Sequence, residues 1–246
     1  MPEHELWVTA LFNKFLAAPA NWALNAVGIT PANAEAPWSN AYSMLVLVVL
    51  IMVVALGYAR TTFSVDKPSR IQTILELFHG FIKGMSSDLI DSHPHKHVPY
   101  FGALFAFILI GNLIGILPTF ESPTMFVVVP LGLATVSFGY YNFMAIREVG
   151  IISWFKHLLG PIPALAPLML IIEVLSHLSR LLSLTVRLYA NMFAGEMVFL
   201  VFLGMVPLGI PVLFMGLHTF VAFLQAYIFT LLVMVYLGQL VEHGEH

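Results

Sequence analysis

The chain has 246 residues, of which 59% are hydrophobic and 9% are charged, and its mean hydropathy is +0.91. Soluble domains carry about 25% charged residues, so this composition excludes a soluble globular enzyme. The balance of 10 Lys and Arg against 13 Asp and Glu gives no basis for nucleic-acid binding, and the lack of cysteine excludes disulfide scaffolds and Cys-ligated metals. The sequence therefore predicts an integral membrane protein.

Five apolar blocks are long enough to cross a bilayer, because a hydrocarbon core of about 30 Å requires about 20 apolar residues in a helix. We expect an all-α fold in which residues 41–246 form a single membrane domain. Residues 1–40 are expected to form an N-terminal segment outside the membrane, with a short surface helix and no signal peptide. The five spans cover about 42–59, 100–118, 126–146, 164–205 and 212–241.

The distribution of basic residues predicts the orientation of these spans. Segments 60–98 and 146–162 together hold seven Lys and Arg residues, whereas the opposite side holds only Lys14. Cytoplasmic loops carry the excess of basic residues, so the N-terminus is expected outside and the C-terminus in the cytoplasm. Within the first segment, apolar residues of 69–89 recur at three- and four-residue spacing, which is typical of an amphipathic helix on the membrane surface.

The last two blocks are too long to stand upright in a bilayer. The 42 residues of block 164–205 would extend about 63 Å as a helix, roughly twice the bilayer thickness. Average tilts of about 20° do not absorb this excess. Because the Pro-Leu-Gly-Ile-Pro sequence at 207–211 separates the blocks, we predict two long, steeply tilted, antiparallel helices.

Block 164–205 contains ionisable residues, although a charge near the bilayer centre costs about 2.5–3.5 kcal/mol. At helical spacing Glu173, Arg180, Arg187 and Asn191 share one stripe, about 27 Å long. Glu196 points to the opposite face. This helix is therefore expected to present two separate polar surfaces.

The last block carries a sparser polar stripe that includes His218 and Gln225, seven residues apart. If Gln225 lies beside Arg187 in an antiparallel pair, His218 falls near the level of residues 194–196, beside Glu196. Two polar pockets separated by an arginine resemble two blind channels. Arginine stays protonated, whereas Glu and His relay protons, so transport would require a moving carboxylate from a partner.

Two motifs closely resemble subunit a of the F-type ATP synthases: SLTVRLYANMFAGE at 183–196 and HTFVAFLQAYIF at 218–229. The resemblance extends to GNLIGILP at 111–118 and IEVLSHLSR at 172–180, and it covers nearly all the chain from about residue 40. It implies a non-catalytic subunit without a cofactor, which passes protons through two offset half-channels and couples their flow to ATP synthesis. The implied partners are a rotating ring of c subunits, the peripheral-stalk subunit b, other ATP synthase subunits and the lipid bilayer.

The resemblance also implies roles for individual residues. Arg187 corresponds to the essential arginine that faces the ring carboxylate, and Asn191 and Gln225 correspond to its polar neighbours. Glu196 and His218 correspond to the relay pair of the half-channel open to the outside. We expect these five residues to form the centre of the transport site.

Two further matches and three departures complete the comparison with the family. Glu173 corresponds to an acidic residue of the cytoplasmic half-channel, and Asn112 to a polar residue of an earlier span that is a candidate for lining the channel. Ala190 replaces a usual glycine, which predicts a slightly wider approach of the helix to the ring. Leu181 replaces a common proline, which predicts a straighter helix. Gly115 replaces an acidic residue found in some members, which predicts less side-chain chemistry in the outer channel.

Several alternatives stay open at this point. Arg180 could bind a lipid phosphate or act in transport, and His177 could line a channel or simply hydrogen-bond to Glu173. The histidines at 93, 95 and 97 are more typical of a solvated loop than of a metal site. The rival functions are an ion-coupled secondary transporter and a structural subunit of a redox complex, although no related halves or broken helices are seen. Sodium coupling, ring size and organism are undecided, and the lack of a transit peptide favours a bacterial inner membrane.

Overall fold

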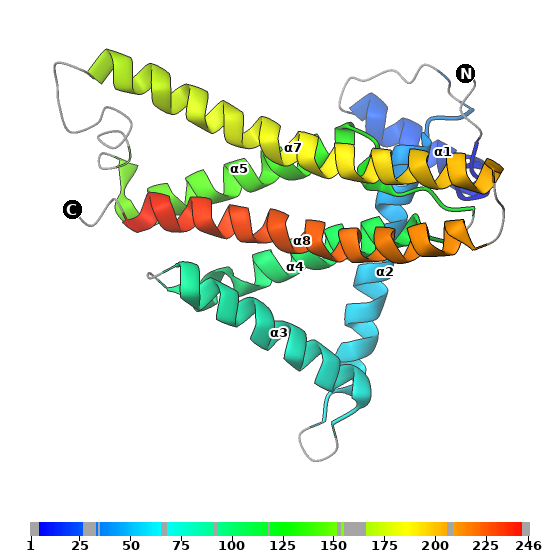
Figure 1. Ribbon diagram of the computed structural model, residues 1–246, viewed down its shortest axis with the longest axis horizontal. Coiled ribbons are helices and arrows are strands. Elements are labelled where there is room, and N and C mark those ends of the chain that lie inside the picture. The colour runs from blue at the N-terminus through cyan, green and yellow to red at the C-terminus, as the bar shows by residue number, and fades with distance from the viewer. Residues whose placement is uncertain are drawn as a thin grey trace.

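The computed structural model describes residues 5–26, 33, 35–64, 68–90, 93–117, 119–151, 154, 166–205 and 209–242. In these ranges the secondary structure is helical, with no strand (Figure 1). The helices are α1 (Trp7–Ala26), α2 (Asn40–Thr62), α3 (Arg70–Leu89), α4 (Pro94–Ile114), α5 (Val128–Val149), α7 (Ala166–Met205) and α8 (Ile210–Glu242), with a 3-10 turn η1 (Pro123–Met125).

Helices α2, α4, α5, α7 and α8 are long and apolar enough to cross a membrane, which confirms the five predicted spans. The largest boundary error is at α4, which begins at Pro94 rather than near residue 100. A proline fits the first turn of a helix, where its missing N–H has no intrahelical acceptor. The histidines at 95 and 97 therefore lie inside α4, and the prediction of a solvated loop was wrong for His97, which is fully buried.

Helices α7 and α8 lie side by side and run in opposite directions along the longest axis (Figure 1). We call the end where α7 finishes at Met205 and α8 begins at Ile210 the turn end, and the opposite end the free end. Helix α8 packs against α3, α4, α5 and α7, so it forms the centre of the bundle. The bundle core includes Phe101, Phe105, Ile108, Tyr141, Leu184, Leu188, Phe229 and Val233.

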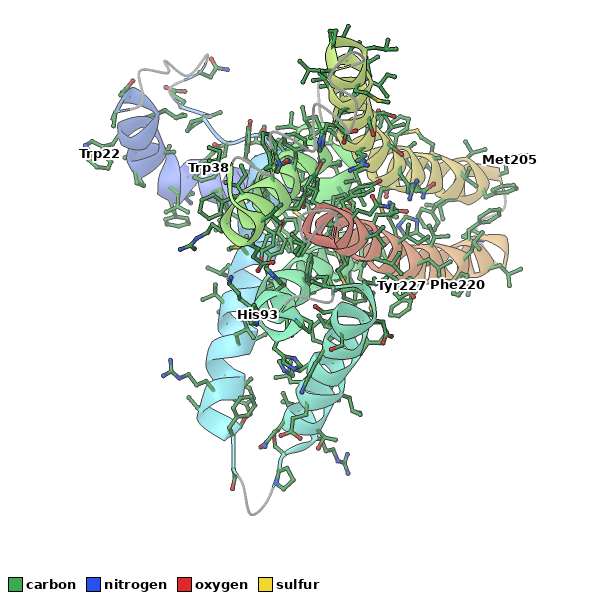
Figure 2. The ribbon with its side chains drawn as sticks, turned by 90° about the vertical axis from the view of Figure 1, so that its left-hand side faces the viewer. Trp22, Trp38, His93, Met205, Phe220 and Tyr227 are labelled. Carbon is green, nitrogen blue, oxygen red and sulfur yellow. The ribbon has the colours of Figure 1, made fainter. Side chains whose placement is uncertain are left out.

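Helices α1 and α2 lie at the turn end, and α2 runs across the direction of α7 and α8 (Figure 1). The buried residues of α2 are concentrated in its first three turns, where the Thr9 and Ser43 hydroxyls lie 2.6 Å apart and connect it to α1. Helix α1 is longer than the short surface helix predicted from the sequence. Figure 2 shows Trp22 of α1 on one side of the molecule and Met205 and Phe220 of the long pair on the other.

Large apolar side chains are exposed on several of the described helices, among them α3 and α7. On α3 the exposed fraction is 64% for Ile74 and 70% for Leu77, although the helix begins with a well-formed cap in which Ser69 accepts a hydrogen bond from the Gln72 amide. On α7 the exposed fraction is 58% for Leu182 and 56% for Val186. Exposed apolar surfaces of this extent are typical of contact with lipid or with another protein.

Candidate functional site

Arg187 lies in the middle of α7, and its side chain is half-buried. Its Nη2 atom donates one long hydrogen bond of 3.5 Å to the Ser183 hydroxyl, one helical turn away. Arg187 forms no ion pair with any residue that the structure describes. A guanidinium is costly to place among apolar groups without a counter-charge, so this arrangement favours an anionic partner from outside the chain.

Asn191 and Gln225 connect α7 to α8 next to this arginine. The Asn191 Nδ2 atom donates a 2.9 Å hydrogen bond to Gln225 Oε1, and Gln225 is almost fully buried. Asn191 follows Arg187 by one helical turn, so its partner Gln225 lies about one turn of α7 away from the level of the arginine. The bond fixes the register of the two long helices close to the one expected from the sequence.

Glu196 and His218 line the same small cavity near the turn end, together with Gly115, Ile116, Phe199 and Met215. The cavity has about 20 Å³ open to the centre of a water molecule, which is enough for one water. The His218 ring packs directly on the backbone of Gly195, where an added Cβ would lie 2.6 Å from Nδ1. His218 therefore lies at the predicted level of residues 194–196, and glycine at 195 allows the ring to approach.

Asn112 of α4 is buried against α8 and against the segment that follows α4. It accepts a 2.5 Å hydrogen bond from the Thr124 hydroxyl and donates a 3.5 Å bond to the Ala222 carbonyl. The Thr124 and Ser122 hydroxyls are 2.7 Å apart, and Ser122 also donates to the Gly111 carbonyl at 2.9 Å. Sequence reasoning missed Ser122 and Thr124, because only the polar ESPT run between two apolar blocks indicated them.

Glu173 lies near the free end of α7, about 35 Å along the helix from Glu196. Its carboxylate is 3.5 Å from Nε2 of His177, one turn later in the same helix. The His177 ring stacks on Tyr141 of α5, and the Arg180 guanidinium lies 5.0 Å from the centre of the Tyr236 ring of α8. The structure therefore brings Glu173 together with His177 and keeps both away from Glu196 and His218.

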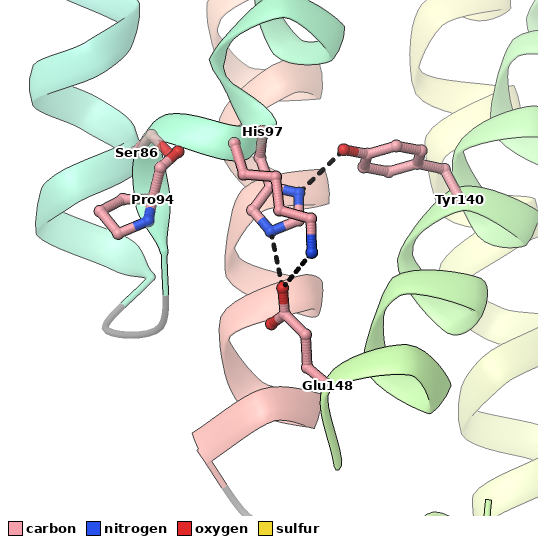
Figure 3. Close-up of polar contacts among 6 residues, drawn as sticks. Ser86, Pro94, His97, Tyr140 and Glu148 are labelled. Atoms are coloured by element: carbon pink, nitrogen blue, oxygen red, sulfur yellow. Dashed lines mark hydrogen bonds and ion pairs between the residues drawn. The ribbon is translucent and has the colours of Figure 1, made fainter. Parts of the chain in front are cut away.

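A second buried polar cluster, also missed from the sequence, joins the start of α4 to the end of α5 (Figure 3). The His97 Nδ1 atom is 2.8 Å from the Tyr140 hydroxyl, and its Nε2 atom is 3.3 Å from Glu148 Oε1. Lys96 also lies 3.3 Å from that carboxylate oxygen. A histidine in an alternating polar run was the available signal, but its partners lie more than 40 residues away in the sequence.

Taken together, the fold and the site define a class: an all-helical membrane protein with ionisable residues at membrane depth, a placement that in membrane proteins typically marks an ion pathway. The comparisons with known proteins are more specific. Residues 41–238 match the model of the family described as ATP synthase A chain. The chain is 44% identical to ATP synthase subunit a of Koribacter versatilis over 241 residues, which are 98% of each chain. It is 46% identical to ATP synthase subunit a of Solibacter usitatus over 236 residues, which are 96% of this chain and 100% of that relative.

The chain therefore belongs to the ATP synthase subunit a family, as its motifs predicted. Its function is that of the non-catalytic proton-channel subunit of the membrane sector. The family assignment therefore excludes the two alternative functions, an ion-coupled secondary transporter and a structural subunit of a redox complex.

Proposed function

We propose that Arg187 separates two half-channels that deliver protons to, and collect them from, the carboxylates of a rotating c-ring. The observation that supports this role most directly is the half-buried guanidinium that has no ion pair within the described chain. It lies between Glu196 with His218 on one side and Glu173 with His177 on the other. A permanent positive charge in this position attracts a deprotonated ring carboxylate and repels a proton that would pass straight through.

In the proposed sequence of steps, a proton from outside enters the region of Glu196 and His218 and neutralises a ring carboxylate. The neutral carboxyl group moves into the lipid, because its transfer into hydrocarbon no longer requires burial of a charge. After almost a full turn it reaches the half-channel on the Glu173 side and releases the proton to the cytoplasm. The ionised carboxylate then meets Arg187 before it is protonated again.

The exposed apolar surface of α7 around Leu182 and Val186 is the proposed contact with the ring. Both side chains are more than half exposed and lie within five residues of Arg187 along the helix. Ala190, which is also exposed, adds one methyl group to this surface where the family usually has glycine. Contacts with subunit b and the other ATP synthase subunits are proposed on the family resemblance.

The proposed setting is a bacterial inner membrane, with the N-terminus outside and the C-terminus in the cytoplasm. The excess of Lys and Arg in segments 60–98 and 146–162 supports this orientation. The exposed apolar face of α3 supports a position on the cytoplasmic membrane surface. In this arrangement residues 41–246 form one membrane domain, α7 and α8 are steeply tilted, and α1 lies outside.

The test is ATP-driven proton pumping and passive proton leak in vesicles that contain the whole complex with Arg187→Ala. We expect pumping to be lost while the complex remains assembled. The matched control is Arg147→Ala, which removes an exposed arginine at the end of α5 and is expected to pump normally. Pumping near the wild-type rate with Arg187→Ala would contradict the proposed role of this residue.

A further inference from the structure

Residues 119–125, which include η1, pack against Gly115 at the end of α4, and Gly115 belongs to the lining of the cavity that Glu196 and His218 share. A Cβ atom added to Gly115 would lie 2.9 Å from the Ser122 Cβ and 3.0 Å from the Ser122 backbone nitrogen. The segment 119–125 is therefore held directly against one wall of the cavity, and only a glycine at 115 permits this contact.

Buried hydrogen bonds hold this segment in place. Ser122, Thr124 and Asn112 are at most 1% exposed, and their hydroxyl and amide groups connect the segment to α4 and, through the Ala222 carbonyl, to α8. These four hydrogen bonds define the position of the backbone next to residue 121. The position of the Glu121 backbone is consequently set by contacts with α4 and α8, and α8 also supplies His218 and Met215 to the cavity lining.

Glu121 is half-buried at this position. Its Oε2 atom accepts a 3.4 Å hydrogen bond from Asn40 Nδ2 at the start of α2. The next residue, Ser122, packs on Gly115 in the wall of the cavity that Glu196 lines, which brings the charge of Glu121 into the surroundings of the Glu196 carboxylate. Glu121 thus bonds to the start of α2 through Asn40 and directly precedes Ser122, which packs on the wall of this cavity.

We propose that Glu121 is a second proton-carrying carboxylate of the entry pathway, which takes a proton from the outside solution and passes it to Glu196. The proton would move from Glu121 to Glu196 directly, or across one water that accepts the Glu121 proton and donates one of its own to Glu196, so that the two carboxylates exchange protonation states and the water is regenerated. This inference rests on the proposed function of the Glu196 and His218 pocket as the outer half-channel. The competing role for Glu121 is structural, in which the carboxylate only fastens α2 to the segment through Asn40.

The test compares three variants of the whole complex in vesicles, in which the rates of ATP synthesis and of ATP-driven pumping are measured over a range of outside pH. Glu121→Gln keeps an oxygen that accepts the Asn40 hydrogen bond but does not ionise. Glu121→Asp keeps an ionisable group on a shorter side chain. Asn40→Ala removes the hydrogen bond and leaves the carboxylate.

If Glu121 carries protons, Glu121→Gln lowers the synthesis rate several-fold, most strongly at high outside pH where protons are scarce. Glu121→Asp recovers part of the rate, and Asn40→Ala stays near the wild type. If Glu121→Gln matches the wild type at every pH, or if Asn40→Ala shows the same loss as Glu121→Gln with no change in the pH profile, the proposal is overturned.

Arg187→Ala, measured in the same vesicles, separates this inference from the function on which it rests. Loss of pumping in Arg187→Ala together with a normal Glu121→Gln would overturn only the role of Glu121. Normal pumping in Arg187→Ala would overturn the half-channel assignment itself.

Discussion

The two ends of α7 carry similar chemical groups in different arrangements. At the turn end, Glu196 and His218 belong to different helices and line a cavity with room for one water. At the free end, Glu173 and His177 are one turn apart on the same helix and are already in contact at 3.5 Å, beside aromatic rings. A carboxylate that borders a cavity can exchange protons with water, whereas a carboxylate in contact with an imidazole can exchange a proton directly with the ring. The two ends therefore differ in one respect: at the turn end there is room for a water beside the ionisable groups, whereas at the free end Glu173 and His177 are already in contact.

The largest effect is expected between the two ends, at Arg187. Arg187→Lys is expected to abolish ATP synthesis almost as completely as Arg187→Ala, because a flexible ammonium does not reproduce the planar guanidinium and its several donors. ATP synthesis in energised vesicles, with the amount of assembled complex measured in parallel, checks this. A Lys variant that retains substantial synthesis would mean that a positive charge at position 187 is sufficient without the guanidinium.

The second-largest effect is expected at Glu196, which is compared with Glu173 at the other end of α7. Glu196→Gln is expected to lower the proton-transfer rate by about 10²-fold, the lower end of what a positioned acid–base group contributes. Glu173→Gln is expected to have the smaller effect, because the amide keeps a polar group 3.5 Å from the His177 ring. Pumping rates of both variants in the same vesicles check the order. The reverse order would show that the free end limits transport.

The approach of His218 to α7 can be blocked without changing any ionisable group. Gly195→Ala would place a methyl group 2.6 Å from the His218 Nδ1 atom, so the ring must move. A displacement of about 1 Å can cost on the order of 10²-fold in a positioned site. We expect a smaller loss of pumping, roughly 10-fold, because both Glu196 and His218 are kept. The matched control is Gly204→Ala in the same helix, where an added Cβ meets no atom within 4 Å. Equal rates in the two variants would argue against a role for the position of His218.

The smallest effect is expected in stability. Thr124→Val removes the hydrogen bond to Asn112 and leaves a buried acceptor without that donor, which costs about 1–3 kcal/mol. The expected result is a lower dissociation temperature of the chain from the solubilised complex. Thr135→Val is the control, since this exposed hydroxyl only bonds to a carbonyl of its own helix. No difference between the two would mean that the segment after α4 does not depend on this bond.

The spans and the long helix pair were predictable because their signals are local. Hydropathy over about 20 residues identifies a span, and the seven-residue spacing of His218 and Gln225 puts both on one side of α8. The start of α4 was placed too late because His95 and Lys96 made its first turn resemble a loop.

The remaining features depend on contacts between distant residues. The Tyr140 and Glu148 partners of His97 and the contact of Ser122 with Gly115 arise only when helices and turns meet in space. Hydropathy and spacing contain no information about such pairs. The register of α7 against α8 was an exception, because the polar side chains that fix it were also the residues that the sequence analysis singled out.

Helix α7 also has a mechanical consequence. It runs without interruption from Ala166 to Met205, and Leu181 stands where the family commonly has proline. In the proposed mechanism, a ring carboxylate that attracts Arg187 would exert a sideways load on this helix. A continuous hydrogen-bonded rod resists bending at that point and distributes the load along its contacts with α5 and α8. In an energy-converting machine such stiffness limits elastic loss, so that the torque turns the rotor and does not deform the stator.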